Sequence, residues 1–246
     1  MLVVSYGGGI NSKALLVGMF ECGINPDAIL FADTGGESPH TYADIASMES
    51  WLSSIAFPSI TVVKVASKTL EQDCLDRKAL PSVAYGYKTC SQRFKREPQE
   101  KWLNNWEPAK AVWKAGHKIT KVIGFDADEP QRAQKYESDK YTQWYPLLDW
   151  NWGREECIEA IDRAKLSQPG KSSCFFCPNR KTSEIRELAD QYPELIARAI
   201  HMEQNAELTS IKGLGRTWSW EDLLRTKEVF GFPDRFSQMP CDCFEG

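Results

Sequence analysis

Short apolar runs alternate with stretches of helical periodicity over the first two thirds of the chain. Residues 2–5 form an apolar run that ends at glycines, and residues 12–20 carry apolar side chains at helical spacing. Four further apolar runs predict strands at 28–32, 60–65, 122–124 and 143–147, with helices beginning near His40 and covering 99–115. Strands separated by helices predict an α/β protein with a parallel, Rossmann-like sheet and helices on both faces.

The pattern becomes helical after residue 153. Residues 154–165 and 182–208 have amphipathic helical spacing, and a tryptophan-rich segment and a polar tail follow. No linker rich in Pro, Gly or Ser separates this part from the sheet. We therefore expect an α/β domain over 1–153 and a helical, cysteine-bearing appendage over 154–246 that packs on it.

Composition narrows the class of protein. The 246 residues are 42% hydrophobic and 26% charged, which is typical of a globular protein. The N-terminus has no basic region, and its apolar run is too short for a signal peptide or a spanning helix, so we expect a cytoplasmic protein without a membrane partner. A net charge of −4 argues against a protein that coats nucleic acid generally. The eight cysteines, in a reducing compartment, favour metal or redox chemistry over disulfides.

Three consecutive glycines, Gly7 to Gly9, lie between the first strand and the first helix in SYGGGINSKALL. Glycines let the backbone turn its N–H groups inward at the start of a helix, where the helix dipole also favours an anion. The spacing is neither GxGxxG nor GxxxxGK[ST]. It predicts a phosphate cradle of another kind, and the alternative is a glycine turn without a ligand.

This loop resembles the SGGxDS loop of the ATP-pyrophosphatase family, in particular the 3′-phosphoadenylyl-sulfate (PAPS) reductase-like branch of the adenine nucleotide α-hydrolase superfamily. Three further stretches are similar to that branch: FADTGGESPHTY at 31–42, GFDADEPQR at 124–132 and YPLLDWN at 145–151. Together they cover roughly residues 2–180. The resemblance implies an adenine-nucleotide site that takes ATP with Mg²⁺.

The resemblance also implies which residues form the site. It places catalytic residues at Asn11, Ser12, Asp33 and Glu37. It places nucleotide contacts at Ser5, Gly7, Gly8, Gly9, Asn11, Ser12, Asp33, Thr34, Gly35, Arg93, Lys95, Arg132, Arg180 and Lys181.

Two loop positions depart from the family pattern. Gly7 stands where the family has Ser, and Asn11 stands where it has Asp. Neutral Asn is a weaker ligand for Mg²⁺ than a carboxylate, so cleavage of ATP is less certain than its binding. Asp33 or Glu37 could supply the missing charge, and both could equally be capping or turn residues.

The cysteines predict a metal centre. Cys174-Phe-Phe-Cys177 has the spacing with which two thiolates grip one metal from a tight turn. Sulfonucleotide reductases that carry a cluster have two consecutive cysteines. Cys90, in KTCSQRFKREP, matches the first of these, and Ser91 stands in the place of the second. The resemblance implies a [4Fe–4S] cluster on Cys90, Cys174, Cys177 and a tail cysteine, Cys243 or Cys241. A cluster held by three cysteines with one open iron, and a zinc site, are the alternatives. Cys22, Cys74 and Cys157 are interpreted as small core residues.

Three functions are compatible with these features. The leading hypothesis is an ATP-dependent sulfurtransferase that adenylates a nucleotide or nucleic acid and receives sulfur from a donor protein. The second is a sulfonucleotide reductase, an oxidoreductase in which Cys241 or Cys243 would be the nucleophile. The third is a nucleotide-sensing module without catalysis, which Asn11 favours.

Overall fold

The computed structural model describes residues 1–133 and 138–226. Its centre is a five-stranded, all-parallel sheet in the order β3-β2-β1-β4-β5. The strands are β1 (Leu2–Tyr6), β2 (Ala28–Ala32), β3 (Ile60–Val63), β4 (Ile119–Ile123) and β5 (Tyr141–Trp144). The predicted parallel α/β sheet is confirmed. The last two strands begin two or three residues before the predicted positions.

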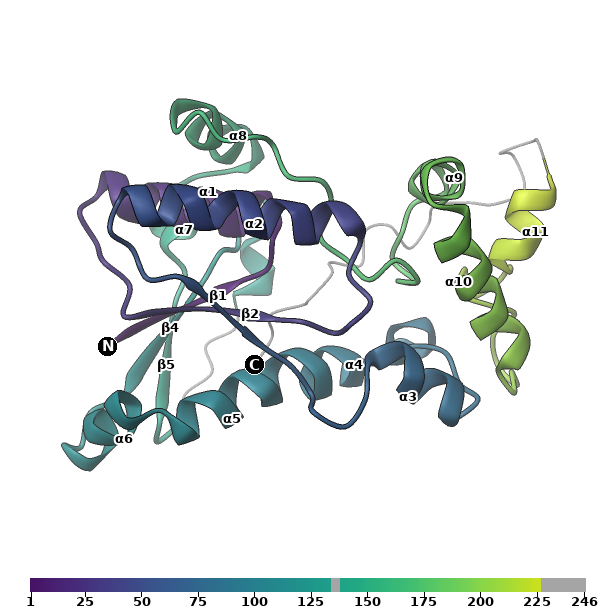
Figure 1. The fold of residues 1–246 in the computed structure, drawn as a ribbon, viewed down its shortest axis with the longest axis horizontal. Coiled ribbons are helices and arrows are strands. Elements are labelled where there is room, and N and C mark those ends of the chain that lie inside the picture. Colours follow the sequence, from purple (N-terminus) through teal and green to yellow (C-terminus); the bar gives the residue numbers. More distant parts are fainter. Residues whose placement is uncertain (134–137, 227–246) are drawn as a thin grey trace.

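Helices cover both faces of the sheet (Figure 1). On one face lie α1 (Ile10–Glu21), α2 (Pro39–Ser54), α7 (Pro146–Asp149) and α8 (Arg154–Arg163). On the other face lie α5 (Glu97–Asn105) and α6 (Glu107–Lys114). Alternate residues of β1 serve the two layers, because successive side chains of a strand point to opposite faces. Val4 and Tyr6 join the core with α1, whereas Val3 joins the core with α5.

A second hydrophobic core lies beside the sheet. It is built by α3 (Leu70–Asp76), η1 (Ser82–Tyr85), η2 (Gln92–Arg96), α9 (Thr182–Gln191), α10 (Pro193–Asn205) and α11 (Trp220–Arg225) around Phe175 and Phe176. The short elements α4 (Thr89–Ser91) and η3 (Pro130–Arg132) complete the described structure. The stretch predicted as one helix over 182–208 is two helices. Pro193 has no N–H to continue α9, and it begins α10 instead.

The part of the chain after residue 153 is shared between the two cores. Cys157, Ala160 and Ile161 of α8 pack in the core of the sheet, whereas Ile185 of α9 and Met202 of α10 pack in the second core. The division at residue 153 stays a prediction. Among the described residues, every helix is too short or too polar to cross a bilayer.

Candidate functional site

The glycine loop joins the end of β1 to the start of α1. Gly8 has a φ of +72°, in the left-handed region where side chains are strained, and a Cβ there would lie 2.8 Å from Thr41 Cγ2. A Cβ on Gly9 would lie 2.8 Å from Ser172 Oγ. The Ser12 hydroxyl closes the turn, because it accepts from the Gly9 N–H at 3.2 Å and donates to the Gly9 carbonyl at 3.0 Å. The loop therefore leaves no room for side chains and presents the start of α1 to its surroundings.

A cleft of about 520 Å³ opens in front of this loop. Ser5, Gly9, Asn11 and Ser12 form its floor, and the segments 124–132 and 170–172 form its walls. Gly7 and Gly8 belong to the same loop and do not line the cleft. Four basic side chains also line the cleft: Arg132, Arg154, Lys171 and Lys181. Four acidic side chains line it as well, and two of these form ion pairs there, Glu129 with Arg132 and Glu184 with Lys171. Cations and a helix N-terminus around one cleft favour an anionic ligand.

Asn11 and Asp126 are joined across the cleft. The Asn11 amide donates from Nδ2 to Asp126 Oδ2 at 2.8 Å. Asp126 is 5% exposed, and its burial raises the pKa of the carboxyl, which the bond from Asn11 partly offsets. Asn11 Oδ1 and Asp126 Oδ1 are buried and have no hydrogen-bond partner among the described residues.

The loop after β2 lies elsewhere than the resemblance implies. Asp33 accepts from the Gly35 N–H and from the Tyr42 hydroxyl, both at 2.7 Å. Thr34 donates to Glu37 Oε1 at 3.0 Å and lines a second pocket. None of Asp33, Thr34, Gly35 and Glu37 lines the cleft at the glycine loop. The expectation that this loop supplies charge beside Asn11 is therefore corrected, because its backbone pairs instead with the cysteine segment.

The three predicted cysteines of the described chain share that second pocket. Cys90 comes from α4, and Cys174 and Cys177 come from a turn closed by the Cys177 N–H on the Cys174 carbonyl at 3.0 Å. Cys174 also pairs with Glu37 in an antiparallel bridge. The pocket wall is mainly apolar, with Leu70, Val83 and Phe176. Three thiols on such a wall are donors that suit soft metals and iron–sulfur clusters.

The cysteine side chains do not yet form a ligand set in this structure. Within residues 1–133 and 138–226, no three His, Cys, Asp or Glu side chains are close enough together to hold one metal ion. Cys241 and Cys243 lie outside the described residues. Burial raises the pKa of the thiols of Cys74 and Cys157 to about 12, as expected for core residues, whereas Cys22 is exposed and the expectation for it is wrong.

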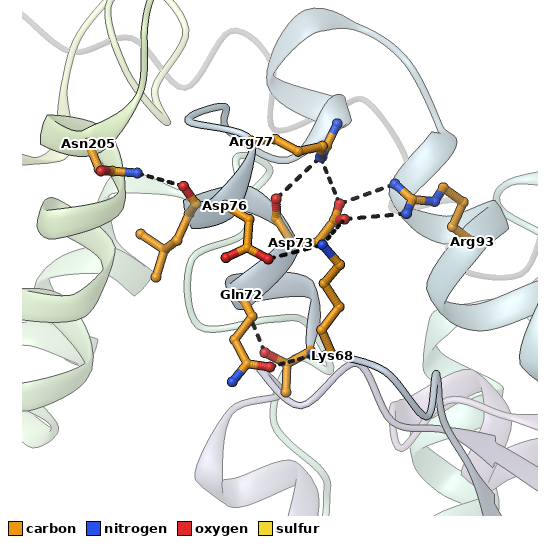
Figure 2. Close-up of polar contacts among 9 residues, drawn as sticks. Lys68, Gln72, Asp73, Asp76, Arg77, Arg93 and Asn205 are labelled. Carbon is orange, nitrogen blue, oxygen red and sulfur yellow. Dashed lines mark hydrogen bonds and ion pairs between the residues drawn. The ribbon is translucent and has the colours of Figure 1, made fainter.

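The predicted basic set is split between four places. Arg132 and Lys181 line the cleft. Lys95 lies in the cysteine pocket, 3.3 Å from Glu37. Arg93 points away from both towards the buried carboxylate of Asp73, which Arg77 and Lys68 also approach (Figure 2). Arg180 is buried and donates to Ser38 and to the carbonyl of Cys174. Arg93 and Arg180 therefore do not line the cleft at the glycine loop, and their predicted role as nucleotide contacts stays a prediction.

Sequence reasoning missed Arg154, Lys171 and Ser172 as cleft residues. Lys171 Nζ lies 2.9 Å from the Asn179 carbonyl and 2.9 Å from Glu184, which fixes the turn between them. The GKSS string directly before Cys174 was the available signal, since it combines a basic residue with two hydroxyls. The segment 170–181 lines both sites: Lys171, Ser172 and Lys181 face the cleft, and the residues 173–174 and 176–179 line the cysteine pocket.

No protein-family model and no curated protein matches the chain. Its structure is similar to that of PAPS reductase from Candida auris in a phosphate complex, with 15% identity, a TM-score of 0.47, and coverage of 70% of this chain and 80% of that one. It is also similar to the U34-tRNA thiolase NcsA from Methanococcus maripaludis with its [4Fe-4S] cluster, with 12% identity, a TM-score of 0.45, and coverage of 85% and 73%.

The parallel sheet, the flanking helices and the glycine loop between β1 and α1 define a Rossmann-like α/β fold. At these identities and TM-scores neither similarity assigns a reaction to this chain.

Proposed function

We propose that this chain is a PAPS reductase-like, adenine-nucleotide-binding enzyme that uses ATP to transfer sulfur to a nucleotide or nucleic acid. The observation that carries the proposal is the segment 170–181, which lines both the phosphate cleft and the cysteine pocket. Ser172 lies against Gly9, and Cys174 is only two residues away. A nucleotide-activated group and a sulfur-carrying centre would therefore be neighbours.

The residues of the cleft suit the first step, in which an acceptor oxygen attacks the α-phosphorus of ATP. The bond to the β-phosphate breaks and pyrophosphate leaves. Loop N–H groups and the N-terminus of α1 hold the phosphates, and the cations Arg154 and Lys181 offset their charge. In the second step, a nucleophilic sulfur at the sulfide oxidation level bonds to the acceptor carbon, and AMP leaves with the oxygen. No net electron transfer is required.

Cys90, Cys174 and Cys177 are the residues that would hold a [4Fe–4S] cluster, with a tail cysteine as the fourth ligand in one version and an open iron in the other. When bound, the cluster supplies iron that can hold sulfur. The chain itself contributes the apolar wall that keeps water away and the Thr34 and Lys95 side chains near Cys174. The loop at 33–37 therefore belongs to this half of the site.

A sulfonucleotide reductase is the second candidate. The neutral side chain of Asn11 on the glycine loop favours it, because a reductase binds the nucleotide without cleaving ATP. It would also need Cys241 or Cys243 as a nucleophile. Incubation of anaerobically purified protein with ATP, Mg²⁺ and candidate acceptors should give AMP and pyrophosphate. Reduction of adenylyl sulfate to sulfite with thioredoxin would indicate the reductase, and neither activity would indicate a sensing module.

The cluster has its own test. Anaerobic protein should be brown, with absorbance near about 400 nm and about four irons per chain. Cys174→Ala should lose the colour, whereas Cys22→Ala, which changes an exposed cysteine outside the pocket, should keep it. A colourless wild-type protein with one zinc per chain would contradict the cluster and leave the nucleotide site standing.

A further inference from the structure

Two oxygens in the cleft at the glycine loop have no hydrogen-bond partner among the described residues. A carboxylate only accepts hydrogen bonds, so the Asn11 amide must turn its Nδ2 towards Asp126, as it does at 2.8 Å. That orientation leaves Asn11 Oδ1 as an acceptor, and Asp126 Oδ1 is another. Both are buried without a hydrogen bond among the described residues. Two buried acceptors on joined side chains are costly unless a cation or a donor reaches them.

Asp126 differs in this respect from the two neighbouring carboxylates of its loop. Asp128 accepts from the Arg154 N–H at 2.7 Å, at the start of α8. Glu129 pairs with Arg132 at 2.6 Å. Among the described residues, Asp126 accepts a side-chain hydrogen bond only from the neutral amide of Asn11. The guanidinium of Arg132 offsets part of its charge, but Asp126 has no ion pair among the described residues, at a cleft whose helix N-terminus favours phosphate.

A carboxylate beside a polyphosphate is repulsive unless a cation lies between them. Mg²⁺ fits this position, because it is held in proteins by one or two side-chain oxygens together with substrate phosphates and keeps several waters. Two protein oxygens are therefore sufficient, and a cluster of three acidic side chains is not needed. Burial raises the pKa of Asp126, and a bound cation would favour the charged form again.

We propose that Asp126 Oδ1 and Asn11 Oδ1 ligate the divalent cation, Mg²⁺, that accompanies the polyphosphate of the nucleotide. The inference rests on the proposed function for its nucleotide. The resembled family has an Asp in the glycine loop where this chain has Asn11. In the proposed site, Asp126 of the segment 124–132 supplies the carboxylate instead. Asp33 and Glu37 are then not needed as metal ligands.

The first experiment measures Mn²⁺, a paramagnetic substitute for Mg²⁺, by electron paramagnetic resonance of the full chain without nucleotide. Asp126→Asn should weaken Mn²⁺ binding by about tenfold or more, because a ligand is lost. Asp128→Asn is the matched control, since it removes the same charge from the same loop and keeps an acceptor for the Arg154 N–H. Asn11→Asp should strengthen binding, because it places two carboxylates around the cation. Equal weakening in the two loop variants would overturn the site.

The second experiment measures binding of a nonhydrolysable ATP analogue by calorimetry, with and without Mg²⁺. For the wild type, Mg²⁺ should tighten binding, and in Asp126→Asn this gain should disappear. Without metal, Asp126→Asn should bind the analogue at least as tightly as the wild type, because a repulsive charge is gone. An equal loss of affinity in Asp126→Asn with and without Mg²⁺ would show that Asp126 accepts a hydrogen bond from the nucleotide, for example from a ribose hydroxyl. That result would overturn the metal site.

The two experiments separate the metal site from the proposed function. A wild type that binds Mn²⁺ through Asp126 and binds no adenine nucleotide would support the site and contradict the function. A wild type that binds the analogue with the same Mg²⁺ gain as Asp126→Asn would support the nucleotide site and contradict the metal ligands.

Discussion

The hydroxyl of Thr34 lies 3.2 Å from the sulfur of Cys174, although 140 positions separate the two residues. The approach is fixed by backbone pairing, because the Phe175 N–H donates to the Gly36 carbonyl at 2.7 Å and Glu37 bridges Cys174. Gly36 allows this, since a Cβ there would lie 2.6 Å from the ring of Phe176. The loop after β2 thus brings Thr34 to the wall of the cysteine pocket.

Thr34→Val should lower the reduction potential of the proposed cluster. The substitution keeps the shape of the side chain and removes the hydroxyl beside Cys174. The single proton of that hydroxyl is donated to Glu37 in this structure and would have to turn to the sulfur of a thiolate ligand. Hydrogen bonds to ligand sulfurs stabilise the more negative, reduced state. An anaerobic redox titration followed by electron paramagnetic resonance measures the potential. Thr120→Val is the control, because Thr120 bonds to Thr142 in the sheet, away from the pocket. The same potential in Thr34→Val and the wild type would show that the hydroxyl does not act on the sulfur.

Gly8→Val should abolish or greatly weaken nucleotide binding. Its φ of +72° is strained for a β-branched residue, and the new Cβ would collide with Thr41. The loop N–H groups would then move away from the phosphates. Calorimetry with the ATP analogue measures the loss, and circular dichroism checks the fold. Gly116→Val separates binding from strain, because Gly116 has a φ of +77° but its Cβ would meet nothing within 4 Å. Unchanged affinity in Gly8→Val would contradict the phosphate site.

The sheet could be predicted because its central strands are short apolar runs buried on both faces. The match is exact for β2, where all five residues are buried. The prediction was poorer for β4 because Lys121 interrupts the apolar pattern. Lys121 is nevertheless buried, since its ammonium pairs with Glu100 at 2.8 Å and lies over the ring of Tyr141. A charge that is neutralised across the fold cannot be recognised from its own segment.

The same limit applies to the site. The glycine loop is a local feature of the chain, so its role could be predicted from consecutive residues. Arg93 and Arg180 are of a residue type that often contacts phosphate. Their guanidinium groups bind Asp73 and Ser38 instead, and no local sequence pattern indicates those partners. The importance of Asp126 likewise depends on Asn11, 115 positions away.

Breaking the buried ion pair behind the glycine loop should strongly destabilise the fold. Lys13 of α1 is fully buried, where it pairs with Asp44 of α2 and donates to the Ser167 carbonyl at 2.9 Å. Lys13→Met would leave the Asp44 carboxylate uncompensated, and we expect it to lower the free energy of unfolding by about 3–5 kcal/mol. Chemical denaturation measures this change.

Two comparisons test the cause of that loss. Lys13→Met combined with Asp44→Asn should cost less than Lys13→Met alone, because the uncompensated charge is gone. Lys110→Met breaks an exposed pair with Glu107 and should cost less than about 1 kcal/mol. A small effect of Lys13→Met, similar to that of Lys110→Met, would show that water reaches Asp44.

Glu203 should make the stability of the second core depend on pH. Its carboxylate is buried and accepts from the N–H groups of Leu214 at 2.6 Å and Trp220 at 3.0 Å. Burial raises the pKa of Glu203 above its usual value of 4.5, and the backbone donors only partly oppose this. A carboxyl whose pKa is higher in the folded state stabilises the fold when it is protonated. That contribution is complete below the usual pKa and is lost as the pH rises through the raised one.

The free energy of unfolding of the wild type, minus that of Glu203→Gln, should therefore fall as the pH rises from below 4.5 towards neutrality. Taking the difference removes the groups that titrate identically in both proteins. Denaturation at a series of pH values measures it. For Glu207→Gln, which changes an exposed carboxylate paired with Lys78, the corresponding difference should stay nearly constant. If the difference for Glu203→Gln instead increases with pH, the backbone donors outweigh burial, and the charged carboxylate is the form that stabilises the contact of α10 with the segment 214–221.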